Sequence, residues 1–197
     1  MKKISILLLF FVCTSLNAQE SGFCFGADVY GGKGIDQRSK TSFGANIVAG
    51  WRFSEFAFLG IGAGFQRTDA QIEHVTVIDY DVTESYDYSQ VNRFKLFVRS
   101  KMNLSDKPIS PFVLFDAGTS FGSKTTLDTI SGLFLEPAVG CDFKLGGVSR
   151  LYLMLGYQCQ NTELYHHGGS REDPYEFGLK QPESFSRQLT LHIGCMF

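Results

Sequence analysis

A serine, two histidines and two acidic residues stand close together in one glycine-rich segment, where residues 165–173 read Y-H-H-G-G-S-R-E-D. Serine, histidine and a carboxylate are the residue types of a nucleophilic hydrolase, in which the imidazole takes the serine proton. The spacing does not set a nucleophile against a base, and the adjacent His166 and His167 do not converge naturally on one metal ion. We therefore expect no enzymatic activity, no cofactor and no metal. A hydrolase that uses Ser170 and His167 is the alternative.

Charged residues recur at every second position in other segments, which places them on one face of an extended chain. Arg99 and Asp116 stand opposite each other if their segments form a symmetric hairpin about residues 105–110, and Glu136 falls near the same level. An unpaired buried charge costs several kcal/mol, so we expect a mutually neutralised network rather than an ion pathway. His192 is expected beside it as a hydrogen-bonded filler. The expected members of the network are Asp28, Arg52, Lys95, Arg99, Lys101, Asp116, Glu136 and Asp142.

The segments that hold these residues alternate between apolar and polar positions. In the segment 184–197 every second residue from Leu189 to Phe197 is apolar, and the residues between them are small or polar apart from Met196. A period of two over this length predicts a β-strand with one apolar face. The same pattern recurs in seven earlier segments. These are 22–31, 42–53, 56–65, 92–104, 112–118, 133–144 and 151–158.

The two faces of these eight segments differ in charge. The apolar faces carry no charged residue before Arg187, whereas the other faces are rich in glycine and charge. A lysine or arginine facing lipid at mid-bilayer costs about 2–4 kcal/mol, and an eight-stranded barrel has an interior just wide enough for side chains. A periplasmic lipocalin-like binder, the soluble alternative, would show the reverse polarity. The predicted fold is all-β, an eight-stranded antiparallel up-and-down transmembrane β-barrel.

The lengths of the links between segments also alternate. The links at 54–55, 105–110 and 146–147 are short, and the longest of the others cover 66–90 and 161–183. Short periplasmic turns and long external loops are typical of outer-membrane barrels, so both termini are expected in the periplasm. Trp51 and Phe53 lie beside a short turn and are expected in the periplasmic aromatic girdle.

One external loop is a candidate for binding a partner. Residues 68–90 mix β-forming residues with six acidic ones, and we expect the flanking strands to continue as a protruding hairpin that turns near 82–85. An exposed strand edge of this kind can bind a surface protein by strand addition. A solvated acidic loop without a partner is the alternative.

The first residues have the pattern of a leader. Met1-Lys2-Lys3 is positively charged, residues 4–12 are apolar, and 16–18 resemble a small-residue cleavage site. We expect a secretory signal peptide over 1–18 and a barrel domain over 19–197. Without Lys2 and Lys3 the 18 basic residues fall to 16 against 20 acidic ones, a net charge of −4. Nucleic acid is therefore not an expected partner.

A leader, eight alternating strands, alternating short and long links, and a terminal aromatic residue together resemble the OmpA/OmpX-like outer-membrane β-barrel family in its single-domain form. The resemblance implies the bacterial outer membrane as location, with its lipid, lipopolysaccharide and the barrel-assembly machinery as partners. It also implies a non-enzymatic structural or surface-interaction role, with a lipid A deacylase-like hydrolase as the alternative. The implied C-terminal assembly signal consists of Leu189, Leu191, Ile193 and Phe197.

Overall fold

The protein forms one closed β-barrel in a computed structural model. The structure describes residues 22–35, 39–78, 81–123, 129–146, 149–162 and 184–197, and the side chains of all of these except 39–40, 70–78, 81–89, 123, 129–131, 162 and 184–185. The signal peptide predicted over 1–18 lies outside these ranges. No helix among the described residues is long and apolar enough to cross a membrane.

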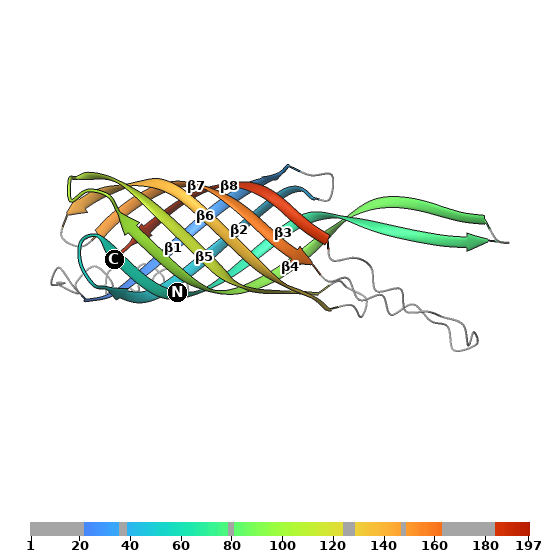
Figure 1. Cartoon of the computed structure of the whole chain (residues 1–197), viewed down its shortest axis with the longest axis horizontal. Coiled ribbons are helices and arrows are strands. Elements are labelled where there is room, and N and C mark those ends of the chain that lie inside the picture. The colour runs from blue at the N-terminus through green and yellow to red at the C-terminus, as the bar shows by residue number, and fades with distance from the viewer. Residues whose placement is uncertain (1–21, 36–38, 79–80, 124–128, 147–148, 163–183) are drawn as a thin grey trace, which may run out of the picture.

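Eight strands follow one another around the barrel in the order of the sequence, and every neighbouring pair is antiparallel (Figure 1). This confirms the predicted fold class. The strands are β1 (Gly22–Gly34), β2 (Ser39–Arg52), β3 (Ala57–Ile78), β4 (Asp81–Asn103), β5 (Ile109–Ser123), β6 (Thr129–Gly146), β7 (Ser149–Thr162) and β8 (Ser184–Met196).

The barrel closes where the last strand meets the first. β8 pairs with β1 from Gln188 opposite Gly34 to Met196 opposite Gly26. Beyond this ladder Phe25 and Phe197 exchange two backbone hydrogen bonds, with N···O distances of 3.0 and 2.7 Å. The final residue of the chain is thus part of the closing seam.

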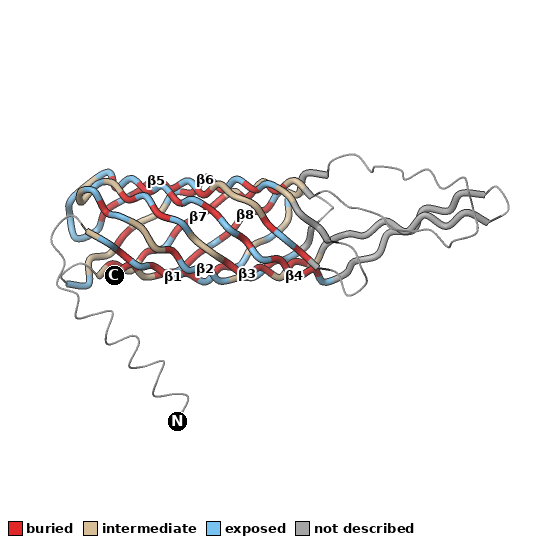
Figure 2. Tube along the Cα trace, turned by 90° about the horizontal axis from the view of Figure 1, so that it is seen from below, coloured by how far each residue is buried: buried red, intermediate tan, exposed pale blue. Residues whose placement is uncertain are grey.

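Burial alternates residue by residue along the strands, as the red and pale blue bands of Figure 2 show. The residues on the predicted apolar faces point outward, and the polar faces line the lumen. Aromatic rings and glycines share the remaining lumen space. A Cβ added at Gly44 would meet the Tyr30 ring, and one added at Gly62 would meet the Phe97 ring. Small residues on one strand thus leave room for large rings from the next, which is how an interior this narrow is filled.

One end of the barrel carries short links and is called the turn end below. The links there are 53–56, 104–108 and 147–148. The first is longer than the predicted two residues, because β2 already ends at Arg52 and a bond from the Phe53 N–H to the Ala57 carbonyl closes the turn at 2.9 Å. Gly146 ends β6 with φ of 127°, a left-handed conformation that glycine adopts without strain.

The opposite end, called the hairpin end below, corrects the prediction of long loops. After β1, β3 and β5 the links are only 35–38, 79–80 and 124–128, because the strands run further than the apolar alternation does. Polar residues extend the ladders past the apolar belt, since backbone pairing does not depend on which face is buried. The link at 163–183 lies outside the described residues.

β3 and β4 continue furthest and form the projecting hairpin of Figure 1. Their pairing runs without a break from Ala57 opposite Met102 to Ile78 opposite Asp81. The protruding hairpin predicted over 68–90 is present, and its two arms are the continued strands β3 and β4. Its turn falls at 79–80 rather than near 82–85, because the register is set by the pairs inside the barrel.

Candidate functional site: the charged lumen

β4 supplies the largest share of the lumen charge. Its inward positions include Arg93, Lys95, Arg99 and Lys101, each at most 6% exposed. The strand is extended, so residues two apart point to the same side and form one line of cations along the lumen. Each cation meets a different set of neighbours, and those neighbours decide what it does.

Arg99 holds the centre of the lumen. Its Nη2 and Nε donate to the two carboxylate oxygens of Asp116 at 2.7 and 2.9 Å, a bidentate pair, and its Nη1 donates to Asp28 Oδ2 at 2.8 Å. The strand register places Arg99 directly opposite Asp116, and Asp116 opposite Glu136. Bidentate arginine–carboxylate pairs are among the strongest polar contacts in proteins, so this pair fixes the central layer.

Asp28 is the most connected carboxylate of the central layer. Besides Arg99 it accepts hydrogen bonds from Asn46 Nδ2 at 2.7 Å and from the Tyr152 hydroxyl at 2.9 Å. The Nδ1 atom of His192 lies 3.0 Å from its Oδ1. These contacts come from β2, β4, β7 and β8, so one side chain joins strands on both sides of the lumen.

His192 lies between two carboxylates. Its Nε2 is 2.8 Å from Glu136 Oε1, which also accepts a bond from the Thr190 hydroxyl at 2.6 Å. Ionised carboxylates only accept hydrogen bonds, so when Asp28 and Glu136 are both ionised, both ring nitrogens donate and the imidazole carries a positive charge. His192 also stacks on Tyr30, with ring centroids 4.6 Å apart.

Lys95 completes the central layer and makes no close ion pair with any described residue. Its Nζ lies 4.4 Å from the centroid of the Tyr30 ring and 5.0 Å from that of Phe134. An aromatic face attracts a cation most strongly where water is excluded. With His192 protonated, the three cations Lys95, Arg99 and His192 balance the three carboxylates of the layer, those of Asp28, Asp116 and Glu136.

A second group of charges lies at the turn end. Lys101 Nζ binds Asp142 at 2.5 and 2.7 Å, Asn103 Nδ2 donates to the same carboxylate at 2.9 Å, and Arg150 Nη1 lies 3.5 Å from it. Arg52 lines the same small pocket, which has a volume of about 10 Å³ and room for one water molecule. The pocket is too small to hold anything larger than a water molecule.

All eight charged residues expected in the network lie in the lumen, but they form two groups instead of one. Sequence reasoning did not assign Arg93, Arg150, Asn46 or Tyr152 to the network. Arg150 follows directly on a turn, where the alternation is too short to fix a face. The other three occupy inward positions of their strands, so the period-two pattern predicts that they are buried. It does not predict which side chains they contact.

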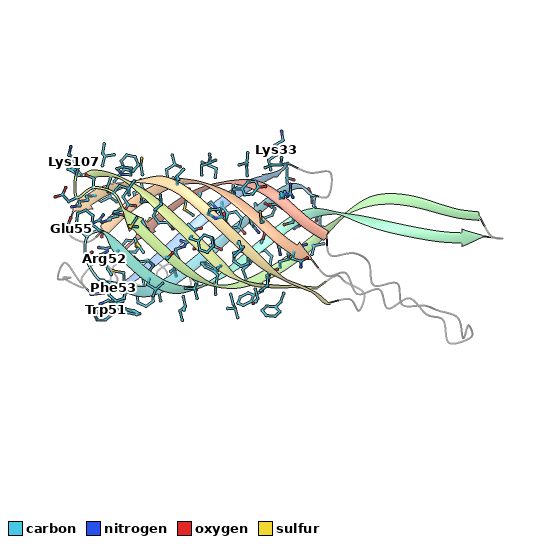
Figure 3. All side chains as sticks on the ribbon, in the orientation of Figure 1. Lys33, Trp51, Arg52, Phe53, Glu55 and Lys107 are labelled. Carbon is cyan, nitrogen blue, oxygen red and sulfur yellow. The ribbon has the colours of Figure 1, made fainter. Side chains whose placement is uncertain are left out.

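The outer surface is apolar over most of the barrel. Trp51 and Phe53 are 50% and 58% exposed, and Figure 3 shows them at the turn end with Glu55 and Lys107. The outward residues of the predicted assembly signal, Leu189, Leu191 and Ile193, are each about half exposed.

Outward charges on the strands gather at the other boundary of this apolar belt, the hairpin end. Among the described side chains they are Lys33, Arg67, Asp69 and Arg187. A belt of exposed apolar side chains around a charged interior is the surface of a membrane-spanning barrel and the inverse of a lipocalin-like binder. The hydrolase candidates His166, His167 and Ser170 lie outside the described residues.

Comparisons with known proteins support the architecture. No model of a known protein family matches the sequence, and no curated protein matches it. Among solved structures, neisserial surface protein A (NspA) matches with a TM-score of 0.53 and 12% identity, over 90% of this chain and 98% of NspA. The N-terminal β-barrel domain of OprF from Pseudomonas aeruginosa has a TM-score of 0.43 and 12% identity, over 91% of this chain and 98% of that domain.

A major outer membrane protein from Thermus thermophilus has a TM-score of 0.43 and 16% identity, over 89% of this chain and all of that one. The likeness to NspA is one of fold, and it covers nearly the whole of both chains. The resemblance inferred from the sequence is thereby confirmed at the level of architecture: this chain has the fold of the small eight-stranded outer-membrane β-barrels.

Proposed function

We propose that the chain is a non-enzymatic integral barrel of the bacterial outer membrane, which presents the β3–β4 hairpin at the cell surface as a site of interaction with another protein. Both termini lie in the periplasm, at the turn end. Lipopolysaccharide and outer-membrane lipid surround the apolar belt, and the barrel-assembly machinery inserts it.

The observation that carries this proposal is the free edges of the hairpin. β3 pairs with β2 no further than Ala70 opposite Ser39, and β4 pairs with β5 only from Asn92 opposite Ser123. Beyond these points, among the described strands, the two strands pair only with each other. Each strand therefore has an outer row of backbone N–H and C=O groups with no described strand beside it.

Unpaired strand edges bind extended peptides through main-chain hydrogen bonds. A two-stranded hairpin alone in water is marginally stable, but here its base is continuous with the barrel. The lumen supports the same reading, because it is filled by paired side chains and a general diffusion pore needs a wider barrel.

The orientation can be tested with single cysteines on intact cells. We expect Thr76→Cys, in the hairpin, to react with a membrane-impermeant maleimide, and Asp106→Cys, in the turn 104–108, to react only after the outer membrane is permeabilised. The unsubstituted chain is the control, since its described cysteines face the lumen or the apolar belt. The reverse labelling pattern would place the termini outside and overturn the proposal.

Binding at the edge can be tested by trimming the hairpin along its register. Ala70 lies opposite Ser89, so residues 71–88 can be replaced by Asn-Gly, which forms a tight two-residue turn. Extended peptides selected from a displayed random library on the wild-type barrel should lose binding to the trimmed one. Retained binding, in a trimmed barrel that still shifts its electrophoretic mobility on boiling, would remove the hairpin as the interaction site.

The absence of enzymatic activity has its own test. Lipid A acyl composition should be unchanged by expression of the protein, and it should be the same with Ser170→Ala and with His167→Ala as with the wild type. A change in acylation that disappears in both variants would establish the hydrolase instead.

A further inference from the structure

The charges of the lumen do not balance along its length. Among the described residues it buries six arginine or lysine side chains and four carboxylates. The central layer is neutral when His192 is protonated, and at the turn end Lys101 and Arg150 share Asp142 while Arg52 lines the same pocket. Arg93, towards the hairpin end, is 4% exposed and makes no ion pair in the described part of the chain.

The layer around Arg93 is polar, and among the described side chains it contains no carboxylate. Gln158 Nε2 donates to Gln66 Oε1 at 3.2 Å, and the Ser42 hydroxyl donates to Gln188 Oε1 at 2.6 Å. Amides and hydroxyls satisfy one another across the lumen but do not offset a positive charge. A buried cation without a counter-charge is strongly unfavourable.

Several polar atoms in this same layer have no hydrogen-bond partner among the described residues. They are Arg93 Nε, Thr68 Oγ1, Tyr30 Oη and Gln158 Oε1. Buried polar atoms are rarely left unpaired, so four in one layer indicate a bound ion or water that completes their hydrogen bonds. Three of the four atoms, all but Gln158 Oε1, carry an N–H or O–H group that can donate to an acceptor.

The register brings these donors together. Tyr30 pairs with Gly44, Gly44 with Gln66, and Gln66 with Arg93, so the four are successive cross-strand partners from β1 to β4. The Tyr30 ring extends over Gly44, where a Cβ would lie 2.6 Å from its hydroxyl oxygen. Thr68 is two residues from Gln66 on β3 and points to the same side. The hydroxyl of Tyr30 thus points across β2 towards β3 and β4, the strands that carry Thr68 and Arg93.

We propose that the lumen binds one small inorganic anion, such as chloride, at Arg93. The guanidinium supplies the charge, and the hydroxyls of Tyr30 and Thr68 donate hydrogen bonds to it. The ion balances the positive charge of Arg93. A larger anion is excluded because the surrounding glutamines are already packed against one another.

The test uses the full mature chain refolded in detergent, with chloride replaced stepwise by the bulky anion gluconate at constant ionic strength. The wild-type melting temperature should rise with chloride and saturate. Arg93→Gln should lose this dependence, whereas Arg67→Gln, which removes an outward arginine of β3, should keep it. An equal rise of melting temperature with chloride in all three proteins would mean general screening of charge. A wild-type melting temperature that does not saturate with chloride would mean that the layer holds only water. Either result overturns the site.

A milder variant covers the case in which Arg93→Gln does not fold. Thr68→Val keeps the shape of the side chain and removes one donor, so the apparent chloride affinity should fall about tenfold. Crystals soaked in bromide provide the direct measurement, with an anomalous peak expected beside Arg93. The absence of that peak, or an unchanged affinity in Thr68→Val, would contradict the proposal.

Discussion

The two faces of β4 meet opposite environments, an apolar one outside the barrel and a charged one inside it. Outward, Phe94, Leu96 and Val98 are each about half exposed; inward, Lys95 and Arg99 are at most 2% exposed. Neighbouring residues of one strand therefore meet opposite environments. In water-soluble proteins the exposed residues are mostly polar. Here the exposed residues are apolar because they face lipid, and the charged residues are buried because they contact one another in the lumen.

The comparison also shows that the two faces have different requirements. An outward residue needs only to be apolar, whereas an inward one needs particular partners from distant strands. Arg99, for example, reaches carboxylates on β1 and β5. Inward substitutions should therefore be more damaging and more dependent on their neighbours than outward ones.

The largest effect is expected at the centre of the lumen. Arg99→Met leaves Asp28 and Asp116 without their shared cation and should lower the free energy of unfolding by about 3–5 kcal/mol. Urea unfolding in lipid vesicles measures this. Adding Asp116→Leu to the same chain should restore part of the loss, since one unpaired carboxylate is removed. Wild-type stability of the single variant would remove the network from the account of stability.

An outward charge should be the next most damaging. Val98 pairs with Ile61 and Ala117 in the middle of the belt, so Val98→Arg should cost about 2–4 kcal/mol in vesicles. Leu104→Arg, also fully outward but on the turn 104–108, should cost about 0–1 kcal/mol by the same rule. Equal costs at the two sites would mean that lipid does not cover the belt.

The addition of a single methyl group should affect the two faces of the barrel wall differently. Gly62→Ala adds a Cβ against the Phe97 ring inside the lumen and should destabilise the barrel by about 1–3 kcal/mol through overpacking. A Cβ at Gly31, on the outer face, has no atom within 4 Å. Gly31→Ala should therefore leave the unfolding midpoint unchanged. Equal shifts of the midpoint in both variants would show that the lumen has room for the extra methyl group.

The smallest effect is expected for an ion pair at the turn end. Lys144 Nζ lies 3.0 Å from Glu55, and both side chains are about 30% exposed. Lys144→Met should cost about 0.2–1 kcal/mol, less in high salt. Lys101→Met, which breaks a buried pair with Asp142, should cost several times more. Similar losses from the two variants would mean that burial does not set the strength of these pairs.

The sequence was sufficient for the fold because period two is a local signal. It placed Lys95 and Val98 on opposite faces, and a symmetric hairpin about a short turn set Arg99 opposite Asp116. It could not give the contact of His192 with Glu136, because that depends on how strands far apart in the chain face one another across the lumen. It also misplaced the hairpin turn, since polar alternation beyond the belt leaves no burial pattern to mark where a strand reverses.

The seam between Phe25 and Phe197 has a consequence for the order of events during biogenesis. Seven of the eight ladders join strands that are neighbours in the chain, whereas the eighth joins its two ends. Ring closure must therefore wait until β8 has been made and can meet β1. Until then the sheet has two open edges, each of which can pair with a wrong strand.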